Sequence, residues 1–126
     1  MINRVVKLLV LLPAIMFVVT GTRWLVAPAG IAPDFGLTLA EGAGLSTQVG
    51  DLASFFLVLG SCMLIALISE RRTWFYPPIM LLTIAAMGRI IAWLFHDATL
   101  VVGSIVVELI VAAILLLASR RLPSSA

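Results

Sequence analysis

The chain alternates between long apolar stretches and short segments that carry most of its charges. Four apolar stretches are each close to the roughly 20 residues that an α-helix needs to cross a hydrocarbon core of about 30 Å. They cover approximately residues 5–26, 48–69, 77–95 and 99–119. None shows the alternation of a barrel strand. The pattern predicts an all-α integral membrane protein, with a single bundle of four transmembrane helices over 1–126.

Composition agrees with this pattern. Of the 126 residues, 63% are hydrophobic and only 11% are charged, whereas charged residues make up about a quarter of an ordinary soluble domain. A chain of this length has room for one bundle only. The single cysteine, Cys62, allows no internal disulfide, and no cysteine or histidine cluster indicates a metal site.

Basic residues predict the orientation of the bundle. Six of the eight lie at the N-terminus, between the second and third spans, or after the fourth: Arg4, Lys7, Arg71, Arg72, Arg120 and Arg121. Because basic residues of short loops stay on the cytoplasmic side, we expect both termini and the turn 70–76 to be cytoplasmic. The loops 27–47 and 96–98 should then be external, with Trp24 and Trp93 in an aromatic belt nearby. Since topology accounts for the basic residues, nothing indicates nucleic-acid binding.

The segment around the end of the first span admits alternatives. An apolar run that ends at Ala-Pro-Ala, residues 27–29, resembles a signal peptide with its cleavage site. The run is longer than usual for a signal peptide and Arg23 interrupts its end, so we expect a retained helix. The long loop 27–47 is rich in glycine and proline, and is either a cap over the external end of the bundle or a disordered tether.

Four charged residues lie in the external half of the predicted spans, one on each helix: Arg23, Asp51, Arg89 and Glu108. At 1.5 Å per residue, Arg89 lies about 10 Å and Glu108 about 14 Å from the external end of its helix. Charges in hydrocarbon cost about 2.5–3.5 kcal/mol each, so they usually face the bundle interior and pair. By depth, we expect Arg89 to pair with Glu108. By the same measure Arg23, about 5 Å deep, pairs with Asp51 at the same depth, unless each reaches the external interface separately.

Small and polar residues share the helical faces of these charges, as buried helix contacts in lipid require. Ala85, Ala92 and His96 lie on the face of Arg89, and Gln48 lies on the face of Asp51. The predicted charged cluster comprises Arg89, Glu108, Asp51, Arg23, Gln48 and His96. It is either a structural ion pair that fixes helix register or a ligand site, and both interpretations stay open.

His96 raises the question of a cofactor. It is either an interfacial polar residue, which we favour, or a proton-exchange group or axial ligand to a haem or chlorophyll-type pigment. Haem held by two histidines would need a second chain, because this chain has one histidine. The sequence therefore implies no particular cofactor, whose identity stays unknown, and we infer no metal site.

Four segments carry a resemblance to a known family. They are VGDLASFFLVLG, the turn ERR, MGRIIAWLFHD and VVGSIVVELIVA. Together they resemble a small bacterial family of unknown function that is similar to the DoxX-like four-helix membrane proteins. The residues that match its pattern are Asp51, Gly88, Arg89 and Glu108. The resemblance implies a four-helix bundle in the inner (plasma) membrane of a bacterium. It implies no activity, since the CxxC, clustered histidines and flavin motif of redox-associated relatives are missing.

Two classes of function fit these observations best. The leading hypothesis is a non-catalytic accessory or scaffold subunit of a larger membrane complex, because no catalytic constellation is recognisable and the lipid-facing surfaces could contact other subunits or a second copy. The alternative is a protein that binds or transports a small molecule (a lipid, quinone or anionic ligand) through Arg89 and Glu108. An enzyme with Glu108 or His96 as proton donor is the least supported class.

Overall fold

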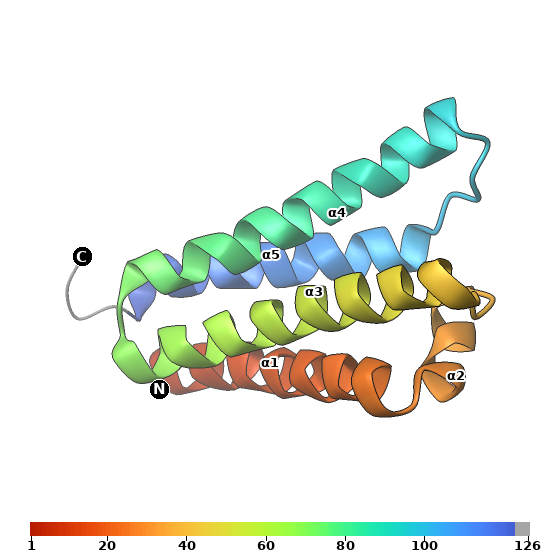
Figure 1. The fold of residues 1–126 in the computed structure, drawn as a ribbon. Helices are drawn as coiled ribbons and strands as arrows, with labels where there is room; N and C mark the ends of the chain where they lie inside the picture. Colours follow the sequence, from red (N-terminus) through yellow and green to blue (C-terminus); the bar gives the residue numbers. More distant parts are fainter. Residues whose placement is uncertain (123–126) are drawn as a thin grey trace.

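Four long helices form the body of the protein in the computed structural model, which describes residues 1–122 (Figure 1). They are α1 (Ile2–Val26), α3 (Gly42–Ser69), α4 (Tyr76–Phe95) and α5 (Val102–Arg121). All four lie in stretches long and apolar enough to cross a membrane. Every element of regular secondary structure within residues 1–122 is a helix, and no strand is present there. This architecture is consistent with the multi-pass membrane protein that the sequence predicts.

Short elements connect the long helices. α2 (Pro28–Ile31) and η1 (Ala32–Phe35) follow α1, and η2 (Arg72–Phe75) joins α3 to α4. α1 packs against α3 and α5, and α4 packs against α5 and α3. The start of α1 and the end of α5 lie at the same end of the bundle, here named the terminal end (Figure 1). The opposite end, which carries residues 27–41 and 96–101, is named the loop end.

Two glycines let α1 and α3 approach each other closely. A Cβ at Gly60 would lie 2.7 Å from the carbonyl oxygen of Ala14, and a Cβ at Gly21 would lie 2.7 Å from Cγ of Leu57. Any larger residue at these positions would collide with the neighbouring helix. Close approach of backbones is a main source of helix association in lipid, where apolar burial gives little driving force.

Most of the core lies in the terminal half of the bundle. Its fully buried residues come from all four helices and from η2, and include Val10, Leu59, Met63, Phe75 and Leu115. Nε of Arg72 donates a hydrogen bond of 2.9 Å to the carbonyl oxygen of Ser119 near the end of α5, where the helix dipole favours a positive charge. The turn η2 is thus fastened to α5.

The loop half is less completely filled, because α4 diverges from the other helices there (Figure 1). The buried residues of α4 are Pro78, Leu82 and Ala86, and no residue of this helix after Ala86 is buried. The divergence also lengthens the connection from α4 to α5. The fourth long helix therefore begins at Val102. The apolar pattern had predicted a start at residue 99.

The loop predicted at 27–47 is a folded cap, which decides between the two alternatives. Ile31 and Ala32 are buried against Trp24 of α1. Gly36 ends η1 with φ of +67°, a left-handed conformation that glycine adopts without strain. Helix α3 begins at Gly42, several residues before the predicted start of the second span at residue 48.

The burial of Trp24 corrects one expectation. Trp24 was expected in an aromatic belt at the membrane interface, but it is fully buried beneath the cap. The apolar pattern did not reveal that the chain folds back over it immediately after α1. Trp93 is 46% exposed, so its position still fits such a belt.

The glycine contact between α1 and α3 gives a stability prediction. Gly60→Ala should lower the thermal unfolding temperature in detergent, because the added methyl meets the Ala14 carbonyl; overpacking of this kind costs about 1–3 kcal/mol. Circular dichroism at the helical band measures the shift. The control is Gly50→Ala, where a Cβ has nothing within 4 Å and alanine favours the helix. Equal destabilisation by both variants would contradict the close contact.

Candidate functional site

The candidate site is built around an ion pair between α4 and α5. Nε of Arg89 donates to Oε1 of Glu108 over 2.9 Å, as the matching depths predicted. The Glu108 side chain is only 11% exposed, whereas that of Arg89 is 35% exposed. Charge-assisted hydrogen bonds of this length are among the stronger polar contacts in proteins. The pair therefore ties α4 to α5 in the part of the bundle where α4 otherwise diverges.

A cavity of about 400 Å³ lies beside the pair, and all four long helices contribute to its wall. This volume is within the range of about 300–1,000 Å³ typical of small-molecule sites. Its walls are mainly apolar, with a few polar and charged side chains. The lining residues central to its chemistry are Met16, Phe17, Thr20, Arg23, Asp34, Phe55, Phe56, Leu59, Leu82, Arg89, Gly103, Ser104 and Glu108.

The cavity is polarised along the bundle axis. On α1, Met16 and Phe17 precede Thr20 and Arg23, so the apolar residues lie nearer the terminal end. On α4, Leu82 precedes Arg89 by seven residues, which correspond to about 10 Å of helix in the same direction. Polar groups thus gather toward the loop end, where the apolar Ile31 and Phe35 of the cap also line the cavity, and the part toward the middle of the bundle is apolar.

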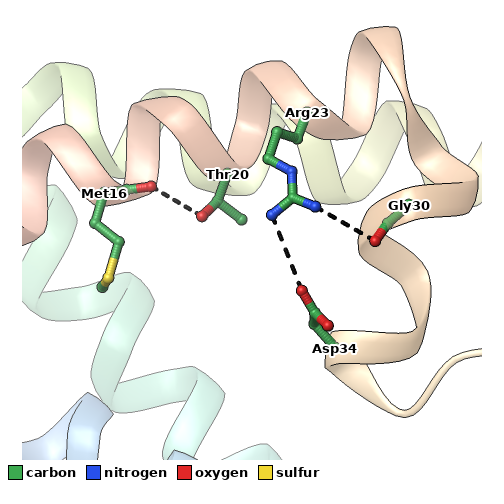
Figure 2. Close-up of polar contacts among 5 residues, drawn as sticks. All are labelled: Met16, Thr20, Arg23, Gly30 and Asp34. Carbon is green, nitrogen blue, oxygen red and sulfur yellow. Dashed lines mark hydrogen bonds and ion pairs between the residues drawn. The ribbon is translucent and has the colours of Figure 1, made fainter.

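Arg23 joins α1 to the cap (Figure 2). One guanidinium nitrogen lies 3.9 Å from Oδ2 of Asp34, and the other donates to the carbonyl oxygen of Gly30 over 3.3 Å. Met16, Thr20 and Arg23 project from one side of α1, and all three line the cavity (Figure 2). Both contacts of Arg23 are long and partly exposed, so they hold it less firmly than the 2.9 Å bond holds Arg89.

The prediction that Arg23 pairs with Asp51 is wrong. Because the cap folds back at the end of α1, Asp34 lies beside Arg23 instead. Asp51 is exposed on α3 and is not among the residues that line the cavity. Similar depth placed Arg23 and Asp51 at one level, but it could not give the rotation of their helices.

The other members of the predicted cluster lie apart from the cavity. Oε1 of Gln48 accepts from the backbone N–H of Ala40 over 2.9 Å, and its Nε2 donates to the carbonyl oxygen of Thr38 over 3.1 Å. Gln48 thus fastens the end of the cap to α3. His96 is exposed just after α4. Of the predicted cluster, the structure brings Arg23, Arg89 and Glu108 to one cavity.

An aromatic group that the sequence analysis did not recognise connects the cap to the cavity wall. Phe56 lies 6.0 Å from Phe17, 5.3 Å from Phe35 and 5.0 Å from Phe55, measured between ring centroids. Phe35 also lies 5.9 Å from Trp24. These separations are typical of favourable aromatic pairs. The sequence signal was the pair Phe55–Phe56, but only the folded cap shows that Phe35 meets it.

A second cavity of about 360 Å³ lies between α3 and α4. Leu52 of α3 lines one side, and the small residues Ala85, Gly88 and Ala92 of α4 line the other. Five residues line both cavities, and they are Phe35, Phe55, Phe56, Arg89 and Glu108. The ion pair and the aromatic group therefore stand between the two spaces.

The chemistry available at the site is hydrogen bonding and charge rather than metal ligation. A guanidinium has five N–H donors, and within residues 1–122 the side chain of Arg89 makes one hydrogen bond, to Glu108. Its other donors have no hydrogen-bond partner in this part of the chain. In the described chain, no group of three or more histidine, cysteine and acidic residues could hold a metal ion. No family model matches the chain, and comparison with curated proteins and with solved structures found no match.

The ion pair gives a test by a double-mutant cycle. Arg89→Met should destabilise the folded protein by about 2 kcal/mol, because it leaves Glu108 largely buried without its partner. The double variant Arg89→Met/Glu108→Leu should recover most of this loss, since an apolar pair leaves no uncompensated charge. Thermal unfolding in detergent measures all three variants, with Glu108→Leu completing the cycle. Strictly additive losses would show that the two side chains do not interact.

Proposed function

We propose that the protein binds a small amphipathic molecule of the bilayer in the cavity beside Arg89 and Glu108. The observation that carries this proposal is the cavity itself, which has about 400 Å³ of space and a buried ion pair in its wall. Ionisable residues at membrane depth are costly and usually serve a function. An ion pair that only fixed helix register would not need an adjoining space of this size.

The polarity of the cavity matches that of a membrane amphiphile. Thr20, Arg23 and Ser104 surround its polar part, and Phe17, Leu59 and Leu82 form its apolar part. A lipid or quinone would lie with its head toward the loop end and its tail toward the middle of the bundle. Molecules of one membrane leaflet already have this orientation, so binding requires no inversion.

Charge balance indicates how the head would bind. The cavity wall contains two arginines and two carboxylates, so its formal charge is already neutral. A head with carbonyl, hydroxyl or carboxyl oxygens accepts hydrogen bonds from the remaining N–H groups of Arg89. The Arg89–Glu108 bond stays intact in this arrangement. Hydrogen bonds to a charged group contribute about 1.5–3 kcal/mol each.

The accessory-subunit function that the sequence favoured stays a prediction, as does the resemblance to DoxX-like proteins. Large apolar residues are exposed along all four long helices, and such surfaces serve lipid contact and subunit contact alike. The cavity supports ligand binding over subunit docking, because docking to another subunit does not require a space of this kind. We therefore place ligand binding first.

We also propose that the terminal end of the bundle faces the cytoplasm, which puts the cavity in the external half. The support is the concentration of basic residues at that end. In a Cys62→Ala background, Ala98→Cys should react with a membrane-impermeant maleimide in intact cells. Thr73→Cys should react only after the cells are made permeable. Both positions are exposed and lie at opposite ends of the bundle. The reverse labelling pattern would overturn this orientation.

Ligand binding can be tested with palmitic acid that carries a photoactivatable diazirine in its chain. After irradiation in detergent micelles, peptide mass spectrometry should find adducts on Phe17 and Leu59, which line the cavity and are buried, above the background on lipid-facing residues such as Val19. Unlabelled palmitic acid should compete for the cavity adducts only. The double variant Arg89→Met/Glu108→Leu should bind the probe about tenfold more weakly, because the head loses its charged donor.

A matched pair of glycine variants separates binding from folding. Gly103 lines the cavity and Gly50 does not, and an added Cβ meets nothing within 4 Å at either position. Gly103→Leu should remove most of the cavity adducts, whereas Gly50→Leu should leave them unchanged. Equal labelling in wild type and Gly103→Leu, with both proteins folded, would contradict the proposal.

A further inference from the structure

We infer that an amphiphile reaches the Arg89–Glu108 site sideways from the bilayer, through the cavity between α3 and α4. This inference rests on the proposed function and adds an access route to it. The cavity lined by residues of all four long helices is here called the binding cavity, and the one between α3 and α4 is called the side opening.

The divergence of α4 provides the opening. No residue of α4 after Ala86 is buried, and the space of about 360 Å³ begins at this level. Gly88 is exposed, and a Cβ there would have nothing within 4 Å. Small residues in a membrane helix usually mark a close contact with another helix. Here Ala85, Gly88 and Ala92 instead border a space, so the α3–α4 gap is open where the side chains of α4 are smallest.

The second step of the route leads from the side opening to the binding cavity, which adjoins it. Arg89 and Glu108 line both spaces, so an amphiphile in the side opening already lies against the ion pair. The Arg89 side chain is 35% exposed, which leaves it accessible from the side opening as well as from the binding cavity. Phe55 and Phe56 complete the boundary between the two spaces. Rotation of Arg89 and of these rings is the movement that passage would require.

The route also fits the chemistry of the occupant. The side opening lies within the membrane-spanning part of α3 and α4, below the loops. A single-chain amphiphile such as a fatty acid can therefore move from the lipid phase along the face of Ala85, Gly88 and Ala92 with its chain still in apolar surroundings. Arg89 receives the polar head at the end of this path. Access from water would instead draw the chain past the polar end of the binding cavity.

The experiment measures the rate of arrival separately from the amount bound. Wild-type protein in phosphatidylcholine vesicles is mixed rapidly with the diazirine palmitic acid and irradiated by flashes at increasing times. Adducts on Phe17 and Leu59, which are buried, report the binding cavity. Gly88→Leu, which narrows the side opening only, should slow their appearance about tenfold and leave the final level unchanged. Gly50→Leu is the control for an added leucine on a helix surface.

Each result decides between alternatives. Gly103→Leu should lower the final level, because it narrows the binding cavity. An unchanged rate in Gly88→Leu would overturn the side route, while normal final labelling would still support binding. A lower final level of cavity adducts in Gly88→Leu would show that the side opening is part of the binding site. That result would also overturn the side opening as an access route. Ala92→Leu, on the same face of α4, should slow the appearance of cavity adducts in the same way. It provides a second test if Gly88→Leu fails to fold.

A helix of a second copy is the competing occupant of the α4 face. If Gly88→Leu changes the mass of the protein–detergent complex from dimer to monomer, the face is a helix contact and the side route is wrong. Failure of the proposed function has a different signature. In that case wild-type protein acquires no cavity adducts above the lipid-facing background at any time.

Discussion

A charged side chain in a bilayer has no water to replace a missing partner, and the loop half of this bundle depends on how Arg89 and Glu108 satisfy each other. Their 2.9 Å bond holds α4 against α5 beyond the last buried residue of α4. The residues of α4 that face α3 at this level are too small to fill the space between the two helices. The bond therefore holds α4 against α5 and leaves α4 apart from α3. Both cavities border the pair for this reason.

The two halves of the bundle use different means to hold helices together. In the terminal half, large apolar side chains fill the centre, and Gly60 lets α1 and α3 meet at backbone distance. In the loop half, α1 and α3 still pack closely at Gly21 and the cap buries Trp24, whereas α4 has no buried residue after Ala86 and is held by its ion pair with α5. A continuously packed core resists rearrangement, because even a methylene group changes its energy. Movement that admits a ligand is therefore expected in the loop half, with the terminal half as a rigid base.

Much of the helical architecture could be predicted from the sequence, because the length of an apolar stretch and the depth of a charge along a helix are one-dimensional quantities. They were enough for the four spans and for the pairing of Arg89 with Glu108. These two quantities could not predict the cap, because its path depends on the turn at Gly36 and on the burial of Ile31 against Trp24. The error over Arg23 followed from this, since its partner Asp34 comes from the cap. The cavities depend on the angle between α3 and α4, which apolar periodicity does not specify.

The two arginines of the binding cavity differ in how strongly their contacts hold them. The pair between Arg23 and Asp34 is long and partly exposed, and pairs of this kind contribute about 0–1 kcal/mol. It cannot be what holds the cap. Trp24 is more informative, because it is fully buried although its indole N–H has no hydrogen-bond partner in the described chain. An unsatisfied buried donor costs about 1–3 kcal/mol, so the apolar contacts of Trp24 with the cap must outweigh that cost. Apolar burial therefore closes the cap, and Arg23 is left able to exchange its contacts with Asp34 and Gly30 for the head of a bound amphiphile while the cap stays in place.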